Sequence, residues 1–287
     1  MGVLHLTPSS PSWPEELRSI DAPPIELWAR GRSELLAQRP RVAIVGSRSP
    51  TPYGEAQARR FAEALARYGA VVVSGLARGI DAAAHEGTVA AGGDTIAVLG
   101  SGVDRPWPAG DTAELVLARG LLLSEHPPGS APRRHHFPLR NRLISGLACA
   151  VLVIEAAHAS GSLITARWAA DQGRSVFALP GRVDHPMARG CHRLIREGAT
   201  LVEAPEGLLE DLGLFSPTGT GEGEEENPHP VVAALTGETL TVDELCVRLR
   251  RTAGPLLAEL IELELEGIVV RAPGGLYRLV PRATQRL

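Results

Sequence analysis

The chain contains no lysine, and all 29 of its basic residues are arginines. A protein without lysine cannot use the phosphate-binding lysine of a Walker loop or form a Schiff base through a lysine amine. Phosphate binding is not excluded, because the planar guanidinium group of arginine makes paired hydrogen bonds to phosphate oxygens. Any phosphate site in this protein is therefore expected to rely on arginine side chains and backbone amides.

Cysteines and aromatic residues are also scarce. Cys149, Cys191 and Cys246 lie far apart, without the spacing of a zinc site or a disulfide framework, so we predict no metal. Aromatic residues make up 4% of the chain, so each exposed one needs a functional explanation.

Long apolar runs are absent as well. No secretory signal opens the chain, and no apolar run reaches the roughly 18 residues that a membrane helix needs. We therefore predict a cytoplasmic protein without membrane contact. A length of 287 residues, an apolar content of 44% and a net charge of −4 are typical of a globular protein with one large and one small domain.

The most distinctive stretch is basic. Residues Arg133–Gly146 contain four arginines and two histidines around Phe137. No acidic residue occurs between Glu125 and Glu155. Soluble proteins usually mix charges of both signs, so an acid-free basic stretch indicates an anionic ligand.

Four apolar segments are each followed by a loop of small residues. The segments are Arg41–Val45, Ala70–Val73, Thr95–Leu99 and Ala150–Ile154, and the loops are Gly46–Arg48, Ser74–Gly79, Gly100–Gly102 and Ser160–Ser162. Such a loop before a helix N-terminus offers backbone amides and the helix dipole to an anion. The first loop lacks G-x-G-x-x-G spacing, so no dinucleotide cofactor is predicted. Arg48 fits either a fixed charge in this loop or an ordinary surface arginine.

The alternation of segments predicts the fold class. Further strands are expected at Leu121–Glu125, Ser175–Leu179 and Thr200–Val202, and helices at Gly54–Tyr68, Ile80–Ala91, Ser160–Gln172 and Arg189–Glu197. Apolar strands alternating with helices about seven times indicate an α/β fold with a Rossmann-like, doubly wound, mainly parallel sheet. Ligands of such sheets bind at the carboxyl ends of the strands. We therefore expect the four loops to meet there and hold a phosphodiester chain.

The flanking regions complete the domain plan. Residues 1–40 are proline-rich and predict an extended lead-in, with short helices near Pro14–Ser19 and Ser33–Gln38, that Trp13 and Trp28 attach to the main domain. Residues 41–215 form the Rossmann-like domain, and residues 216–229, rich in glycine and glutamate, predict a flexible acidic linker.

Residues 230–287 predict a small winged-helix-like domain. Helices are expected at Val231–Leu235, Val242–Leu249 and Gly254–Glu266, followed by a hairpin over Ile268–Val280. The third helix carries four glutamates and no basic residue, and phosphate repulsion disfavours such a face on DNA. We interpret this domain as a protein-contact or structural module.

Asp81 and His85 are four residues apart at the start of an expected helix. An acid in the first helical turn suits the helix dipole. The two side chains could form an acid/base pair, but we favour a helix-capping pair.

Several ordered motifs resemble those of the DNA-processing protein A (DprA/Smf) family over about residues 13–280. The matching segments are Gly46–Arg48 with Tyr53 and Gly54, Ser74–Asp81 with His85, Phe137–Leu147, Glu155–Ala156 with Ser160–Ala166, and Pro180–Gly181. The resemblance implies a protein that binds single-stranded DNA, protects incoming DNA and helps load the RecA recombinase in natural transformation. It also implies a homodimer through the Rossmann-like domain, no cofactor and no catalysis.

The resemblance further implies that Arg48 and Arg134 grip phosphates and that Phe137 stacks on a base, as a single-strand groove requires. The DNA-binding residues predicted from loops, basic stretch and resemblance together are Gly46, Ser47, Arg48, Ser74, Gly75, Arg78, Arg134, Phe137, Arg140, Asn141, Arg142, Ser160, Gly161, Ser162 and Thr165.

One alternative is an enzyme. Related Rossmann-like folds include phosphoribohydrolases that process nucleoside monophosphates, and Glu155 would then be the candidate acid. Those enzymes have a P-G-G-x-G-T loop before a helix, where this chain has Ala159–Thr165 with a different pattern.

Overall fold

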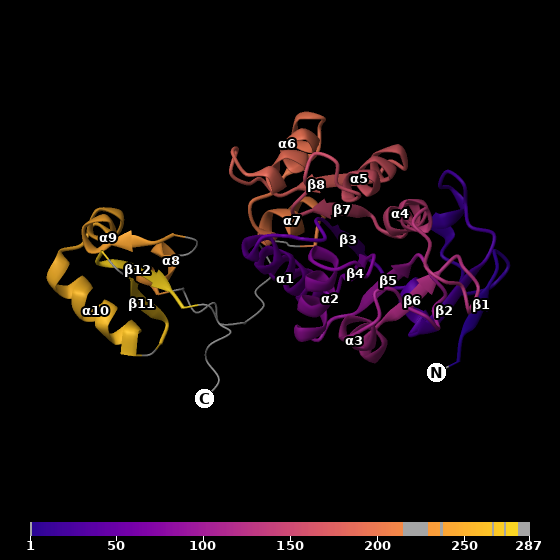
Figure 1. Cartoon of the computed structure of the whole chain (residues 1–287), viewed down its shortest axis with the longest axis horizontal. Coiled ribbons are helices and arrows are strands. Elements are labelled where there is room, and N and C mark those ends of the chain that lie inside the picture. The colour runs from indigo at the N-terminus through magenta and orange to yellow at the C-terminus, as the bar shows by residue number, and fades with distance from the viewer. Residues whose placement is uncertain (1, 215–228, 236–237, 266, 273, 281–287) are drawn as a thin grey trace. The chain divides into compact units, whose positions relative to one another are not determined.

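The computed structural model describes residues 2–214, 229–235, 238–265, 267–272 and 274–280. The chain divides into two compact units, Met1–Pro217 and Thr218–Leu287 (Figure 1). The predicted acidic linker falls almost entirely outside the described residues, so its conformation stays a prediction. No helix among the described residues is long and apolar enough to cross a membrane.

The main unit is built on one nine-stranded sheet. Its strands are β1 (Leu4–Leu6), β2 (Leu27–Gly31), β3 (Arg41–Val45), β4 (Val71–Ser74), β5 (Thr95–Leu99), β6 (Leu121–Ser124), β7 (Ala150–Val153), β8 (Ser175–Ala178) and β9 (Thr200–Leu201). They lie in the order β1-β2-β6-β5-β4-β3-β7-β8-β9, and every pair from β6 to β9 is parallel. The predicted mainly parallel, Rossmann-like sheet is confirmed.

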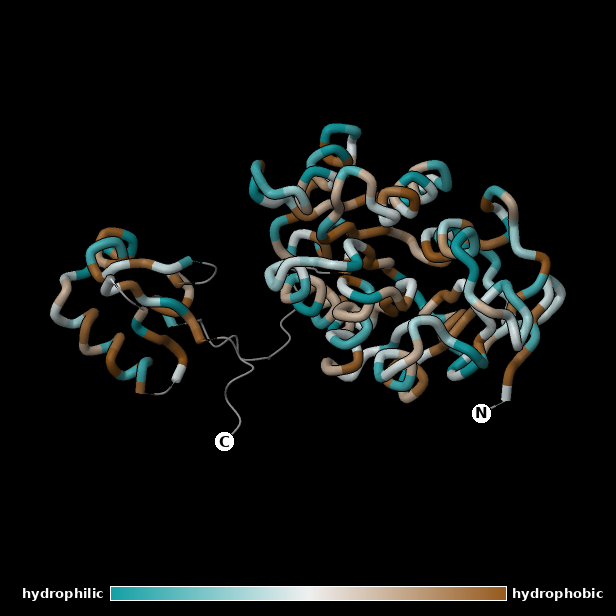
Figure 2. Tube along the Cα trace, viewed as in Figure 1, coloured by the Kyte–Doolittle hydropathy of each residue, from teal (hydrophilic) through white to brown (hydrophobic). Residues whose placement is uncertain are grey.

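Helices cover both faces of this sheet. They are α1 (Pro52–Arg67), α2 (Ile80–Ala90), α3 (Asp111–Arg119), α4 (His136–Leu147), α5 (Ser162–Asp171), α6 (Arg189–Arg196) and α7 (Pro205–Asp211), with 3-10 turns η1 (Glu15–Arg18), η2 (Ser33–Leu36) and η3 (Pro186–Ala188). In β3, Ala43 packs with helix α4 while Val42 packs with helices α1 and α2. Successive strand residues point to opposite faces, so a strand covered on both faces has to be apolar throughout. Figure 2 shows this as brown strands inside the main unit.

The N-terminal segment is more than the extended lead-in that we predicted. Trp13 and Trp28 are buried, and short 3-10 turns lie close to the two expected helices. Two strands were missed, however: β1 pairs with β2, and β2 pairs antiparallel with β6. Both strands are short and stand beside proline-rich segments, so strand signals were weak. The partner of β2 in the main sheet, β6, also lies about 90 residues further along the chain.

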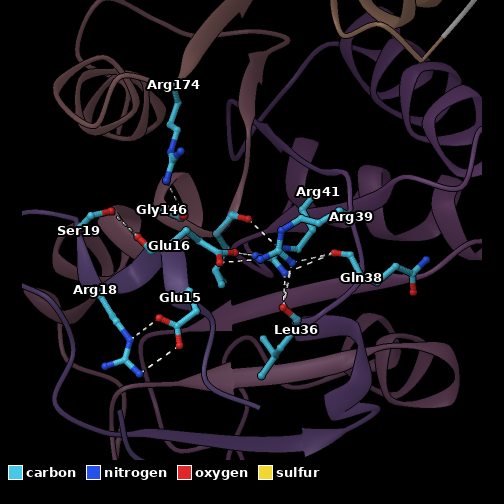
Figure 3. A network of polar contacts seen from close by, with 11 residues as sticks. Glu15, Glu16, Arg18, Ser19, Leu36, Gln38, Arg39, Arg41, Gly146 and Arg174 are labelled. Carbon is cyan, nitrogen blue, oxygen red and sulfur yellow. Dashed lines mark hydrogen bonds and ion pairs between the residues drawn. The ribbon is translucent and has the colours of Figure 1, made fainter. Parts of the chain in front are cut away.

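A buried polar network holds this segment to the sheet (Figure 3). Arg41 at the start of β3 is fully buried; it donates to the carbonyl oxygens of Leu36 and of Leu147 (2.6 Å) and forms an ion pair with Glu16. Arg39 also contacts Glu16, at 2.6 Å. Burial lowers the pKa of Arg41 to about 10, so it remains charged at neutral pH. The network joins the first strand of the parallel sheet to η1, η2 and the end of α4.

The C-terminal unit has the three helices and antiparallel sheet of a winged helix. The helices are α8 (Pro230–Ala234), α9 (Val242–Leu249) and α10 (Ala253–Leu265), and the sheet order is β10 (Leu240–Thr241), β12 (Leu276–Leu279), β11 (Val269–Ala272). Thr241 and Glu244 form a reciprocal capping box at the start of α9, with Thr241 Oγ1 accepting from Glu244 N. Leu256, Leu260 and Leu263 of α10 are buried in this unit's own core.

Candidate nucleic-acid interface

The four small-residue loops follow β3, β4, β5 and β7, which are neighbours in the sheet. The chain leaves β3 toward β4 on one side, while β7 lies on the other side, so the strand order reverses between β3 and β7. A doubly wound sheet opens a crevice at such a switch point. A cavity of about 600 Å³ lies there, lined by residues of the β3 and β7 loops, by Ala77 and Asp81, by Arg134 and by α4.

The β3 loop presents Arg48 to the cavity. A Cβ atom on Gly46 would lie 2.6 Å from Cγ1 of Ile80, so only glycine allows the loop to approach helix α2 this closely. Gly79, with a φ of +80°, lies against the carbonyl oxygen of Ser47. The β3 loop and the loop before α2 therefore pack closely at their glycines. The side chain of Arg48 is exposed.

Phe137 lies at the centre of the site. Its ring is half-buried at the first turn of α4, and the guanidinium carbons of Arg48 and Arg140 lie 5.6 and 5.9 Å from the ring centroid. A Cβ on Gly100 would be 3.1 Å from the Phe137 ring, so the β5 loop supports the ring from below. We expected this loop to contribute to the binding site, but it does not line the cavity.

Arg140 has a structural position behind Phe137. It is 4% exposed, and its Nη1 donates to the carbonyl oxygens of Gly75 (2.5 Å) and Val98. Asp81 accepts from the backbone amides of Gly75 (3.1 Å) and Ala77 (3.3 Å). Burial lowers the pKa of Arg140 to about 10, so the group stays positive at neutral pH. It holds the β4 loop and adds a fixed charge under the ring.

Asp81 and His85 do not form the expected pair, whether capping or acid/base. Asp81 binds the β4 loop, whereas His85 Nδ1 lies 2.7 Å from the hydroxyl of Thr95, whose own proton is donated to the carbonyl of Val72 at 2.8 Å. His85 Nδ1 must therefore be the donor, which leaves Nε2 unprotonated. Helix α2 carries the two side chains to different neighbours.

The β7 loop forms the opposite wall. Ser160 Oγ and Ser162 Oγ are 2.8 Å apart, and Asn141 donates from Nδ2 to the carbonyl of Gly161 at 3.3 Å. Thr165 lines the same wall one turn into α5. This wall offers hydroxyl groups and the N-terminus of a ten-residue helix to an anion.

Three exposed arginines line this cavity or the one beside it. Arg134 lines this cavity, and Arg48 lines both it and a second cavity of about 380 Å³, which Arg78 also lines. Within the described ranges, none of the three has an ion-pair partner. Their charges are available to a ligand.

Two predicted site residues are not brought to the cavities. Ser74 is fully buried and donates to the carbonyl of Ile44 at 2.6 Å. Arg142 is 7% exposed and pairs with Glu125 at 2.6 Å while donating to the carbonyl of Ala22 at 2.8 Å. The prediction for Arg142 was wrong because it assumed that the whole basic stretch lies on one surface. The stretch is helical from His136 onward, so Arg142 and Phe137 lie on different sides of the helix.

One feature of the site escaped sequence reasoning, and one residue that the sequence singled out has a structural role. The missed feature is Trp107, which lines the second cavity with half of its surface exposed. Because the chain has few aromatic residues, this tryptophan could have been singled out from the sequence. Glu155, the candidate catalytic acid, accepts from the backbone amide (2.9 Å) and hydroxyl (2.6 Å) of Thr51. A Cβ on Gly54 would lie 2.5 Å from this carboxylate, which thus occupies the N-terminus of α1.

The sequence of this chain was compared with protein families and with known proteins. The sequence profile described as DNA recombination-mediator protein A matches residues 5–213, and the DprA winged helix domain matches residues 216–275. Protein Smf of Escherichia coli is 41% identical over 290 residues, covering 96% of this chain and 77% of that protein. DNA processing protein DprA of Bacillus subtilis is 41% identical over 213 residues, covering 74% and 72%.

Solved structures give the same result. DNA processing protein A from Streptococcus pneumoniae superposes with a TM-score of 0.69 at 40% identity, covering 72% of this chain and 74% of that one. The Helicobacter pylori protein, described through its single-stranded DNA binding mode, has a TM-score of 0.65 at 31% identity, covering 72% and 95%. With two profiles matched in sequence order and close relatives along nearly its whole length, this chain belongs to the DNA recombination-mediator protein A (DprA/Smf) family.

Proposed function

We propose that this protein binds single-stranded DNA, without catalysis, along the loop edge of its parallel sheet. The observation that carries the proposal is the half-buried ring of Phe137, with the guanidinium groups of Arg48 and Arg140 at 5.6 and 5.9 Å from its centroid. The ring lines a cavity that the unpaired arginines Arg48 and Arg134 also line. An aromatic face among cations is what a single-strand groove needs, because bases stack on the ring while arginines contact the phosphates. The binding mode described for the Helicobacter pylori relative supports this assignment.

The proposed contacts follow from which polar groups of each side chain are exposed and unpaired. Arg48, Arg78 and Arg134 bind phosphates, since their guanidinium groups are exposed and have no acidic partner in the described parts of the chain. Arg140 acts through its charge beneath the ring. The remaining predicted contacts in the cavity walls are Gly46, Ser47, Gly75, Asn141, Ser160, Gly161, Ser162 and Thr165. Ser74 and Arg142 are left out of the proposed interface.

The wider role is proposed from the family. Membership supports protection of incoming DNA, loading of the RecA recombinase in natural transformation and recombination, and a homodimer working in the cytoplasm. We do not propose the phosphoribohydrolase alternative, because the carboxylate of Glu155 is already engaged by Thr51 and the start of α1.

The test is competition between single-stranded and duplex oligonucleotides for the full chain. Oligo-dT is expected to compete far better than duplex of equal length, because only an unpaired base can stack on Phe137. Its affinity should fall with log salt by a slope of roughly −0.7 for each phosphate neutralised. Arg67→Ala is a matched control, since this exposed arginine lies at the far end of α1 and lines neither cavity. Equal affinity for both DNA forms would overturn the proposal.

A further inference from the structure

The second cavity, of about 380 Å³, adjoins the first. Both are lined by Arg48, Ser49, Ala77, Phe137 and Arg140, so these residues form the wall between them. On the far side, the second cavity is lined by Gly75, Arg78, Trp107 and Pro108. A ligand that passes Phe137 and continues along the loop edge therefore reaches Trp107 next.

Trp107 is exposed in a way that the other tryptophans are not. It is 51% exposed, whereas Trp13 and Trp28 are 5% and 9% exposed and belong to the core. Trp168 is half-buried. An aromatic ring left in solvent beside a cavity is a common feature of surfaces that stack on flat ligands. The chain contains few aromatic residues, so the placement of this one is informative.

The loop that carries Trp107 is anchored. Val103 is fully buried, and Ser101 Oγ donates to the carbonyl of Arg105 at 2.8 Å. The Asp104 carboxylate accepts from the backbone amide of Gly129 at 2.8 and 2.9 Å, and Pro106 and Pro108 restrict the backbone on either side of Trp107. The ring is therefore presented by a defined backbone, and the nearby carboxylate of Asp104 is already occupied.

We propose that Trp107 is a second base-stacking platform, and that the second cavity takes the nucleotide next to the one stacked on Phe137. Arg48 lines both cavities, so it contacts the phosphate that joins the two nucleotides, while Arg78 contacts the outer phosphate. The inference rests on the proposed function, because it adds a subsite to the same single-strand path.

The experiment follows tryptophan fluorescence while the full chain is titrated with oligo-dT. A base stacked on Trp107 should quench part of the emission. Trp107→Phe should abolish that part while recovering most of the affinity that Trp107→Ala loses, because phenylalanine still offers a stacking face. The loss for Trp107→Ala should be about 5- to 150-fold, the usual worth of one stacked base. Trp168→Phe is the control, since Trp168 lies in α5 and lines neither cavity.

A strand with abasic residues separates stacking from loop damage. It keeps the phosphates but has no bases, so Trp107→Ala and wild type should bind it equally if Trp107 only stacks. An equal loss on the abasic strand, or emission in which Trp107→Phe and wild type respond identically to oligo-dT, overturns the second subsite. If Trp107→Ala binds normally while Phe137→Ala does not, only the subsite is wrong. If Trp107→Ala, Phe137→Ala and Arg48→Ala all bind oligo-dT like wild type, the proposed function itself is wrong.

Discussion

The loop edge of the main sheet and the end of helix α9 in the C-terminal unit both carry clustered arginines, but the partners of these arginines differ. At the loop edge, Arg48, Arg78 and Arg134 are exposed without ion-pair partners among the described residues. In the C-terminal unit, Arg248 pairs with Glu238 at 2.8 Å and Arg251 with Glu259 at 2.5 Å. Helix α10 also exposes Glu262 and Glu264 to solvent.

The comparison shows that the number of arginines does not decide where an anion binds. Residues 230–287 contain seven arginines and seven acids, and the whole chain is acidic at −4. Exposed, unpaired charge does not decide it either, because Arg67 in α1 and Arg250 in the C-terminal unit are also exposed without an ion-pair partner among the described residues. What distinguishes the loop edge is that its unpaired arginines line cavities that an aromatic ring also lines. Within the main unit, burial separates Arg140 and Arg142 from exposed Arg134, although all three belong to one basic stretch.

The largest expected effect comes from a buried arginine. Arg140→Ala would leave the carbonyl groups of Gly75 and Val98 without their donor and Asp81 without a nearby positive charge. We expect the free energy of unfolding, measured by urea denaturation, to fall by about 3–5 kcal/mol. The exposed Arg78→Ala should change it by less than about 0.5 kcal/mol. Similar unfolding curves for the two variants would show that buried and exposed arginines contribute equally to stability, contrary to this prediction.

Acid should destabilise the main unit through His85. This side chain is fully buried, and burial lowers its pKa to about 3. The unfolded chain takes up the proton near pH 6.5, whereas the folded chain does so only near pH 3, so the stabilisation is complete above pH 6.5 and decreases below it. The loss should be on the order of 2 kcal/mol by pH 4.5.

The matched variant for this prediction is His85→Asn, whose amide nitrogen can replace Nδ1 as the donor to Thr95 but does not titrate. Urea unfolding of wild type and variant from pH 7 to pH 4.5 provides the comparison. The variant should be less stable at pH 7 because of the cavity it leaves, yet its stability should decrease less with acid. Parallel pH curves would show that another group causes the acid sensitivity.

Phe137→Ala should weaken oligo-dT binding by about 1–3 kcal/mol, the usual worth of a base stacked on an aromatic ring. The salt dependence should hardly change, because no charge is removed. The ring is half-buried at the helix surface, so the melting temperature should remain close to that of wild type. A large fall in melting temperature with unchanged affinity for oligo-dT would instead mark Phe137 as part of the protein's packing.

Arg48→Ala and Arg134→Ala should each weaken binding several-fold at moderate salt. Each should also reduce the steepness of the plot of log affinity against log salt by about 0.7, since one phosphate contact is lost. Salt titrations of both variants beside Arg67→Ala test this. A change in affinity without a change in slope would argue against a direct phosphate contact.

The smallest effect is expected at the C-terminal unit. A chain ending after residue 214 should bind oligo-dT about as tightly as the full chain, because the exposed glutamates of α10 repel phosphates. A large loss of affinity would show that Arg248, Arg250 and Arg251 at the end of α9 contribute a DNA surface. If affinity survives but stimulation of RecA filaments falls, the unit is a partner contact.

Much of the fold follows from local sequence patterns. The expected strand Arg41–Val45 coincides with β3, and the expected helices Gly54–Tyr68 and Ile80–Ala91 differ from α1 and α2 by two residues or fewer at either end. Apolar periodicity, glycine turns and caps act over a few residues, so a short window of sequence reveals them. The strands β1 and β2 escaped because their pairing across the sheet carries no local signal.

The sequence by itself determined the α/β alternation, the placement of the glycine loops at one edge, the acid-free basic stretch and the winged-helix pattern. Only the tertiary structure decided which basic side chains remain free. Arg140 contacts Gly75, 65 residues away, and Arg41 reaches Glu16 in the N-terminal segment. Likewise, Trp107 and Phe137 line one cavity although 30 residues separate them. Burial and ion pairing depend on neighbours that are distant in the chain, and these neighbours are defined only when the sheet and its helices pack together.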